Sequence, residues 1–206
     1  MTGTQAVTFL VFAAVAAGTP GPSNALLTAT GAQVGVRRGL PCWFGVTIGM
    51  SAMMFAVAFG LGSAILGHPL VLEIVKWCGA ALLCWLAWKI ASASPAAHGD
   101  DGPRTERRTL GFWSGAAFQW VNPKAWLVAA SASATFLDRH AGGAAGQAAA
   151  LAGLFLVAAL PGCFPWLLFG AVAHHVLRTA RARRALNIGM GAVLAASVVL
   201  FVWPHP

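Results

Sequence analysis

An uncharged apolar run of membrane-spanning length, interrupted at its midpoint by a lysine, constrains this chain more than any other feature. The run covers residues 111–137, and Lys124 is its only charged residue. A lysine at the centre of a membrane helix costs about 2.5–3.5 kcal/mol on insertion scales. Pro123, directly before it, removes a backbone hydrogen bond at the same depth. Two unfavourable features on adjacent residues indicate a functional site inside a membrane.

The composition extends this conclusion to the whole chain. Of its 206 residues, 58% are hydrophobic and 9% are charged, whereas a soluble domain carries about 25% charged residues. The length accommodates about six spans with short connections, so we expect one all-α membrane domain over residues 1–206. The net charge of +8 does not indicate nucleic-acid binding, because the basic residues are dispersed among short loops.

Six apolar runs are predicted to cross the bilayer, with a break in the fifth at Pro161 and Pro165. The runs cover residues 5–33, 41–66, 70–90, 110–137, 147–172 and 186–203. If the N-terminus lies outside, ten of the thirteen basic residues fall in inner segments, as the positive-inside rule requires. These ten are Arg37, Arg38, Lys89, Arg104, Arg107, Arg108, Arg178, Arg181, Arg183 and Arg184. We therefore predict that both termini lie outside.

A polar linker divides the chain into two three-span halves. The halves cover about residues 1–95 and 108–206, and the cytoplasmic linker lies at about residues 92–109. Because three is odd, the two halves enter the membrane in opposite senses. In each half the first span has a helix-breaking motif at its centre, and the two motifs are Pro20-Gly21-Pro22 and Asn122-Pro123-Lys124. Interrupted segments at corresponding positions of inverted halves point to a transporter's substrate site.

The chemistry of the two breaks predicts the kind of ligand. A proline has no N–H, so the carbonyl four residues before each proline loses its helical partner. The carbonyls concerned are those of Ala16, Gly18 and Gln119. Freed carbonyls attract a substrate ammonium, whereas Lys124 and the N–H groups of the following half-helix attract a carboxylate. We therefore predict a site for a zwitterion. The candidate substrate-binding residues are Pro20, Gly21, Pro22, Ser23, Asn24, Gln119, Asn122, Pro123 and Lys124.

A structural role is the alternative for some of these residues. Prolines often only kink membrane helices, and amide side chains can join neighbouring helices. For Pro22 or Gln119 alone the two interpretations are equally open. For Lys124 the functional interpretation is favoured, because a central lysine does not easily reach the membrane interface.

Glu73 is the one acidic residue inside a predicted span. It precedes Lys76 by three residues, so we expect these two side chains to form an ion pair near the outer surface. Proton coupling by Glu73 is the alternative. The spans contain no cluster of acids, no Ser-His-Asp arrangement and no metal-ligand set, so neither an enzyme nor a cofactor or metal site is expected.

Several motifs, in order along nearly the whole chain, resemble those of the LysE/RhtB amino-acid exporters. They are Thr19-Pro20-Gly21-Pro22, Arg37-Arg38, residues 76–81 (KWCGAA), residues 85–89 (WLAWK) and residues 119–125 (QWVNPKA). Residues 85–91, 118–122 and 134–136 are most similar to the cysteine/O-acetylserine exporter branch. Two departures bear on the substrate: Ser23 separates the Pro-Gly-Pro motif from Asn24, and the chain has no tyrosine.

The resemblance implies a carrier in the bacterial inner membrane that exports neutral amino acids or their derivatives. Cysteine, O-acetylserine, homoserine and threonine are the expected substrates. The resemblance further implies transport driven by the proton gradient, contact with membrane lipid, and a homodimer.

Two other functions remain as alternatives. Cys42 and Cys163 lie beside prolines in the second span of each half, and a redox pair there would make a transmembrane thiol–disulfide electron conduit. The cysteines have no Cys-x-x-Cys spacing, so small buried side chains are the favoured interpretation. A passive channel is the second alternative, and uphill transport would exclude it.

Overall fold

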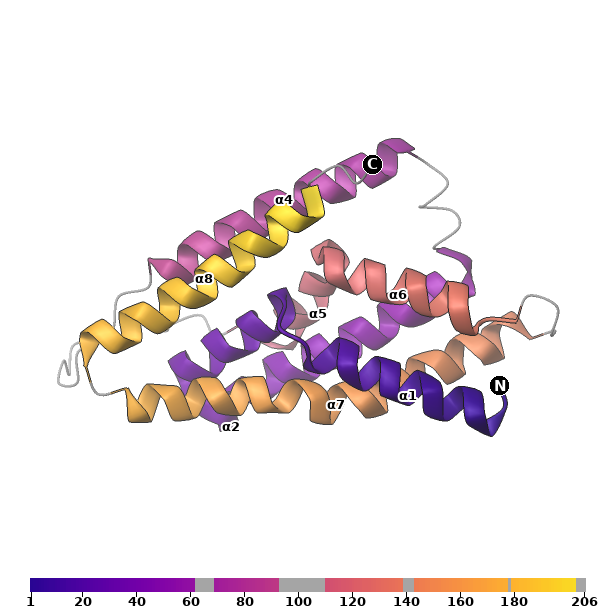
Figure 1. Ribbon diagram of the computed structural model, residues 1–206, viewed down its shortest axis with the longest axis horizontal. Coiled ribbons are helices and arrows are strands. Elements are labelled where there is room, and N and C mark those ends of the chain that lie inside the picture. Colours follow the sequence, from indigo (N-terminus) through magenta and orange to yellow (C-terminus); the bar gives the residue numbers. More distant parts are fainter. Residues whose placement is uncertain (62–68, 93–109, 139–142, 178, 203–206) are drawn as a thin grey trace.

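The computed structural model describes residues 1–61, 69–92, 110–138, 143–177 and 179–202, and the described part is all helical, as predicted. Its elements are α1 (Gly3–Gly18), α2 (Pro22–Ala56), the π-helical turn η1 (Val57–Leu61), α4 (Pro69–Ala91), α5 (Phe112–Val121), α6 (Pro123–Phe136), α7 (Ala144–Val176) and α8 (Ala180–Val202). Apart from residue 92, the predicted linker is outside the described residues. Figure 1 shows how the helices are arranged.

Both predicted helix breaks are present. Thr19 follows α1 with an extended backbone (φ −69°, ψ 142°), the conformation that a following proline favours. Pro22 then opens α2, where its missing N–H removes no helical hydrogen bond. In the second half, Asn122 is extended (φ −86°, ψ 110°) between α5 and α6, and Pro123 opens α6.

The long helix α2 folds back on itself at Gly35. The Gly35 backbone (φ 74°, ψ 178°) is in a region that glycine adopts readily. On either side of it, Thr30 Oγ1 lies 3.8 Å from Cys42 Sγ, although twelve residues of straight helix would separate them by about 18 Å. The element therefore consists of two segments, residues 22–34 and 36–56, that run in opposite directions (Figure 1).

The predicted break in the fifth span is wrong. Helix α7 continues through Pro161 and Pro165, and the second segment of α2 likewise contains Pro41. All three prolines lie on the exposed surface of their helices. Each proline removes one hydrogen bond from a long helix, and a membrane helix packed among neighbours tolerates that loss.

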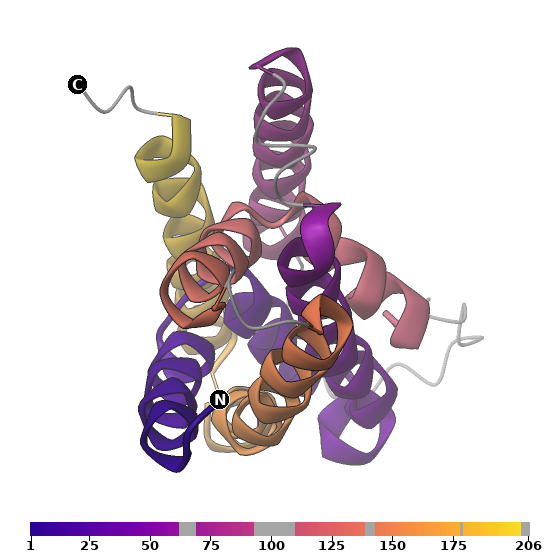
Figure 2. The same ribbon diagram turned by 90° about the vertical axis from the view of Figure 1, so that its right-hand side faces the viewer.

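Close helix crossings hold the central helices together. An added Cβ on Gly170 of α7 would overlap the carbonyl of Thr28 on the first segment of α2. Similarly, a Cβ on Gly45 of the second segment would overlap the carbonyl of Phe112 on α5. Glycine at these positions lets the backbones touch. Helices α4 and α8 pack mainly on each other, to one side of α1, α2, α5, α6 and α7 (Figures 1 and 2).

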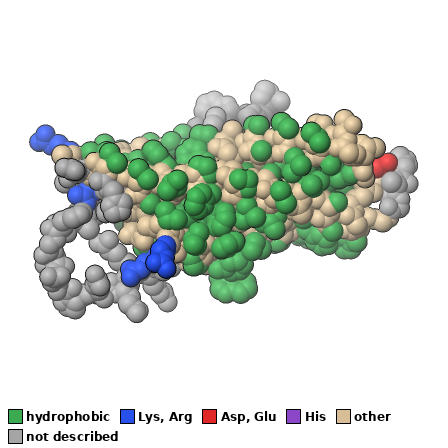
Figure 3. Space-filling model, turned by 90° about the horizontal axis from the view of Figure 1, so that it is seen from below, with side chains coloured by type: hydrophobic (Ala, Val, Ile, Leu, Met, Phe, Trp, Pro, Cys, Tyr) green, Lys and Arg blue, Asp and Glu red, His purple; other side chains and the backbone are tan. Residues whose placement is uncertain are grey.

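Hydrophobic side chains are spread over the face shown in Figure 3, among backbone and other side chains, and Lys and Arg lie toward one end. Large side chains such as Trp113 and Trp88 are 81% and 69% exposed. By length and composition two helical stretches, Pro22–Leu61 and Ala144–Ala173, are apolar enough to span a membrane, and the first of them includes the reversal at Gly35. An exposed surface of this kind matches a hydrocarbon environment.

Candidate functional site

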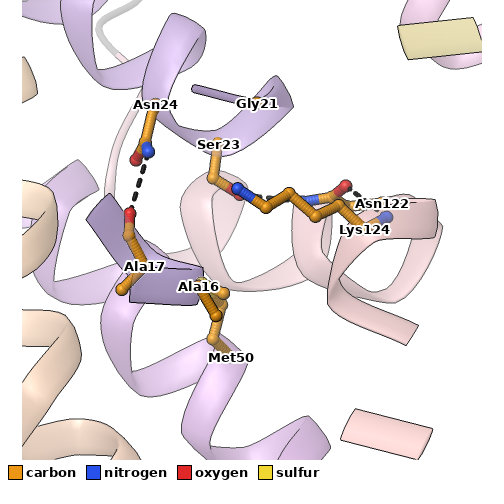
Figure 4. A pocket seen from close by; sticks show the side chains of 8 residues that line it. All are labelled: Ala16, Ala17, Gly21, Ser23, Asn24, Met50, Asn122 and Lys124. Atoms are coloured by element: carbon orange, nitrogen blue, oxygen red, sulfur yellow. Dashed lines mark hydrogen bonds between the residues drawn. The ribbon is translucent and has the colours of Figure 1, made fainter. Parts of the chain in front are cut away.

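The two helix breaks meet in the interior of the protein. Ser23 Oγ, at the start of α2, donates to Gln119 Oε1 at 2.8 Å and accepts from Asn122 Nδ2 at 2.8 Å. All three side chains are buried. Figure 4 shows Ser23 facing Asn122 and Lys124 across the contact between the two breaks. The predicted proximity of the two motifs is therefore present in the fold.

The remaining polar atoms of Gln119 and Asn122 bind their own helices. Gln119 Nε2 donates to the Gly115 carbonyl at 3.1 Å. Asn122 Oδ1 accepts from the Lys124 backbone N–H at 3.1 Å and so caps α6. A buried amide is stabilising only when its donors and acceptors are paired. This network therefore fixes the position of α6 relative to α2.

The carbonyls predicted to be free are already occupied. The Gln119 carbonyl accepts the Asn122 N–H at 3.2 Å. The Ala16 carbonyl accepts the Thr19 hydroxyl at 3.1 Å, and the Gly18 carbonyl accepts the Trp166 indole N–H at 3.1 Å. Each of these carbonyls thus accepts a hydrogen bond from another donor in place of the N–H that a proline removes, and their role toward a substrate ammonium stays a prediction.

The Lys124 ammonium instead binds oxygens one or two residues further along the first break. Nζ donates to the Thr19 carbonyl at 2.8 Å, to Thr19 Oγ1 at 2.9 Å and, more weakly, to the Pro20 carbonyl at 3.5 Å. These oxygens lie just beyond the C-terminus of α1, where the helix dipole favours a positive charge. The lysine thereby joins the second break to the first.

Gly21 makes room for the lysine side chain. An ideal Cβ at Gly21 would lie 2.8 Å from Lys124 Cδ and 3.1 Å from Nζ. Any larger residue would therefore push the lysine away from Thr19. Gly21 was predicted as a site residue, and this close approach gives its role a physical reason.

Asn24 shares the Thr19 carbonyl with Lys124, and its own side-chain oxygen is left without a partner in the described part of the chain. Its Nδ2 donates to the carbonyls of Ala17 and Thr19 at 2.8 and 2.7 Å. Its Oδ1 has no hydrogen-bond partner among the residues that the structure describes, although the side chain is only 3% exposed. A buried acceptor without a partner is uncommon and often marks a place for a ligand or water.

A small cavity lies between the two breaks (Figure 4). It is lined by Ala16, Ala17, Gly21, Ser23, Asn24, Met50, Asn122 and Lys124. Its volume is about 10 Å³, which is about the minimum for one water molecule. An amino acid does not fit in a cavity of this size.

The remaining predicted site residues are three prolines at the two breaks and Glu73 on α4. Pro22 and Pro123 are buried at the first positions of α2 and α6, and Pro20 is exposed. Glu73 is exposed on α4, where Trp77 Nε1 donates to its carboxylate at 2.8 Å. The side chain of Lys76 is outside the described residues, so its ion pair with Glu73 stays a prediction.

Several residues at the site were not among the sequence-derived candidates, and besides Ala16 and Ala17 of the cavity wall they include Thr19, Met50 and Trp166. Thr19 supplies two oxygens to Lys124, and its place directly before Pro20 was the available clue. Met50 lines the cavity from the second segment of α2, and Trp166 reaches the first break from α7. No local sequence pattern connects these last two residues to the breaks.

The two cysteines considered for an electron conduit are buried free thiols with separate surroundings. Cys42 Sγ contacts Thr30 Oγ1, and Cys163 Sγ contacts the Ala17 carbonyl, each at 3.8 Å. Both are held as small polarisable side chains between helices. This arrangement does not favour a redox role.

Comparison with known proteins places the chain among transport proteins. The family model described as LysE type translocator matches residues 10–203. A cysteine/O-acetylserine efflux protein of Salmonella typhimurium (strain LT2) is 33% identical over 129 residues, which is 63% of this chain and 64% of the relative. The protein of the same name from Escherichia coli O1:K1 is 34% identical over 137 residues, 66% of this chain and 68% of the relative. The alignment thus spans slightly less than two thirds of the Salmonella protein. No solved structure matches the chain.

Proposed function

This chain belongs to the LysE type translocator family, and from that premise we propose that it exports amino acids or amino-acid derivatives across the bacterial inner membrane. The mechanism that we propose is secondary transport by alternating access. The family membership supports the transport class, and the geometry between the two breaks supports the substrate class.

The observation that carries the proposal is the contact between the Lys124 ammonium and the oxygens of Thr19. One short region contains a cation on α6 and, just beyond the end of α1, the carbonyl oxygens of Thr19 and Pro20 and the hydroxyl of Thr19. A carboxylate would bind the first and an ammonium the second. These are the two charged groups of every free α-amino acid, and Asn24 Oδ1, which has no partner among the described residues, is an acceptor beside them.

The charge of the site favours a neutral amino acid. Within the described part of the chain, Lys124 is the one charged residue among those that line the cavity. A second positive charge on the substrate would be placed near it without a counter-ion, which is unfavourable at low dielectric. Cysteine and O-acetylserine, which the names of the similar proteins specify, both meet this requirement and are our proposed substrates.

The proposed topology has six spans in two inverted halves, with both termini outside. In this scheme α1 with the first segment of α2 is equivalent to α5 with α6, the second segment of α2 to α7, and α4 to α8. Two packing relationships support it. The second segment of α2 crosses α5 closely at Gly45, and α7 approaches α1 closely at Gly162. In the proposed scheme α7 is the equivalent of the second segment of α2, and α1 is the equivalent of α5. The two contacts therefore correspond to each other in the two halves. Transport driven by the proton gradient and a homodimeric state rest on the family resemblance alone.

Transport by purified protein in liposomes tests the proposal. Vesicles are loaded with radiolabelled cysteine, O-acetylserine, homoserine, threonine, lysine or arginine, and a proton gradient is imposed. We expect exchange and uphill movement of the neutral amino acids and none of lysine or arginine. Equilibration without accumulation would instead indicate a passive channel, and no movement of any amino acid would contradict the proposal.

A further inference from the structure

The Lys124 ammonium has the surroundings that an α-ammonium group would need. It is a primary ammonium with three N–H donors, and it faces three oxygens of Thr19 and Pro20 at 2.8, 2.9 and 3.5 Å. The adjacent cavity of about 10 Å³ leaves no space for a second ammonium group beside it. Thr19 and Pro20 are exposed, so a substrate ammonium that approaches these oxygens has to compete with the lysine that is bound to them.

From this geometry, and resting on the proposed function, we infer that Lys124 is an internal stand-in for the substrate's ammonium. In the empty site its Nζ occupies the Thr19 oxygens and holds the two breaks together. When an amino acid enters, its α-ammonium takes over these oxygens, and the released lysine pairs with its α-carboxylate. The exchange makes and breaks hydrogen bonds of the same kind, so the ammonium subsite is never left without a cation.

Two structural details make the exchange feasible. The lysine reaches Thr19 through a flexible four-carbon chain that passes over Gly21, where there is no side chain to hold it. The two nearer oxygens are also held without the lysine, because Asn24 Nδ2 donates to the Thr19 carbonyl and the Thr19 hydroxyl donates to the carbonyls of Val15 and Ala16. The subsite would thus keep its shape when the lysine leaves. The substrate must have both a free primary amine and a free carboxylate.

The inference predicts that removal of the lysine creates a binding site for a simple amine. The test uses the purified full-length protein in detergent and measures binding of n-propylammonium by calorimetry, with tetramethylammonium as a cation that has no N–H. Lys124→Met is expected to bind n-propylammonium at least about tenfold more tightly than the wild type, the effect of one charge-assisted hydrogen bond. Neither protein should bind tetramethylammonium.

Three further variants make the result decisive. Lys89→Met, which removes an exposed lysine that lies over Trp85, should bind no amine. Thr19→Val in the Lys124→Met background should weaken amine binding again. Gly21→Ala retains the lysine but displaces it, and should also gain amine binding, which provides a second route if Lys124→Met does not fold.

The outcomes separate this inference from the proposed function. Amine binding by the variants in a protein that transports no amino acid would support the stand-in role and contradict the export proposal. Normal export by the wild type, with no amine binding by folded Lys124→Met or Gly21→Ala, would leave the export proposal standing and overturn the stand-in role.

Discussion

The side chains of Ser23 and Asn122, ninety-nine residues apart, are joined by a buried hydrogen bond of 2.8 Å. Each residue follows or forms a helix break, and each belongs to a different half of the chain. The bond therefore fixes the two interruptions against each other in the interior, where an unpaired amide or hydroxyl would be costly. Together with the contact between Lys124 and Thr19, this bond joins the two helix breaks into one candidate site.

Asn122 should contribute to stability through two separate functions. Asn122→Ala removes the cap of α6, worth about 1 kcal/mol, and leaves buried partners unpaired at about 1–3 kcal/mol. Asn122→Ser keeps a capping oxygen but cannot span the distance to Ser23. We expect the unfolding temperature in detergent to fall most for Asn122→Ala and by less for Asn122→Ser. Equal unfolding temperatures for the wild type and Asn122→Ala would contradict the role of this network.

Gly170 and Gly153 lie on the same helix and should respond oppositely to the same change. A Cβ at Gly170 would overlap the Thr28 carbonyl, whereas a Cβ at Gly153 meets nothing within 4 Å. Gly170→Ala should force α7 and α2 apart, at a cost of about 1–3 kcal/mol. Gly153→Ala should be neutral or slightly stabilising. Thermal unfolding of the two variants in detergent measures the difference. If Gly153→Ala lowered the unfolding temperature as much as Gly170→Ala, the close contact between α7 and α2 would not be the cause of the loss.

The buried cysteines should be dispensable for transport. Cys42 and Cys163 each make one long contact, at 3.8 Å, through sulfur, and a serine hydroxyl can replace either one. The double variant Cys42→Ser, Cys163→Ser is expected to export substrate within about twofold of the wild type, because a buried hydrogen bond of this kind contributes little net free energy. Loss of transport in a correctly folded double variant would revive the electron-conduit alternative.

Single cysteines can test the proposed orientation in a background whose native cysteines are changed to serine. Asp138→Cys lies between α6 and α7, and Arg181→Cys lies at the start of α8, and both positions are exposed. We expect a membrane-impermeant thiol reagent added to intact spheroplasts to label Asp138→Cys and to spare Arg181→Cys until the membrane is opened. The reverse pattern would place both termini inside.

The helices and their two breaks were predictable because their determinants are local. Long uncharged runs mark the helices, and Pro20, Pro22 and Pro123 have no N–H and restrict the residue before them. Lys124 was identifiable because a charge in an apolar run has few structural uses. The reversal inside α2 also falls where the sequence predicts it, between the spans 5–33 and 41–66, but its position at Gly35 is not distinguished in the sequence from the other glycines.

The details of the site depended on distant residues and were not predictable. The Gly18 carbonyl is satisfied by Trp166, 148 residues away, and the Ala16 carbonyl by the hydroxyl of Thr19. These donors replace the N–H groups that the prolines remove, and the prolines themselves do not identify them. The continuity of α7 through Pro161 and Pro165 likewise reflects its packing among neighbouring helices.

The central claim is that Lys124 binds the substrate's carboxylate, and the most direct measurement is transport by Lys124→Met in liposomes beside Lys89→Met. The account predicts that the rate of cysteine or O-acetylserine export by Lys124→Met is lower than that of the wild type by at least about tenfold, as expected for the loss of a charge-assisted hydrogen bond. Lys89→Met should transport at the wild-type rate. Export by folded Lys124→Met at the rate of the wild type would contradict the account.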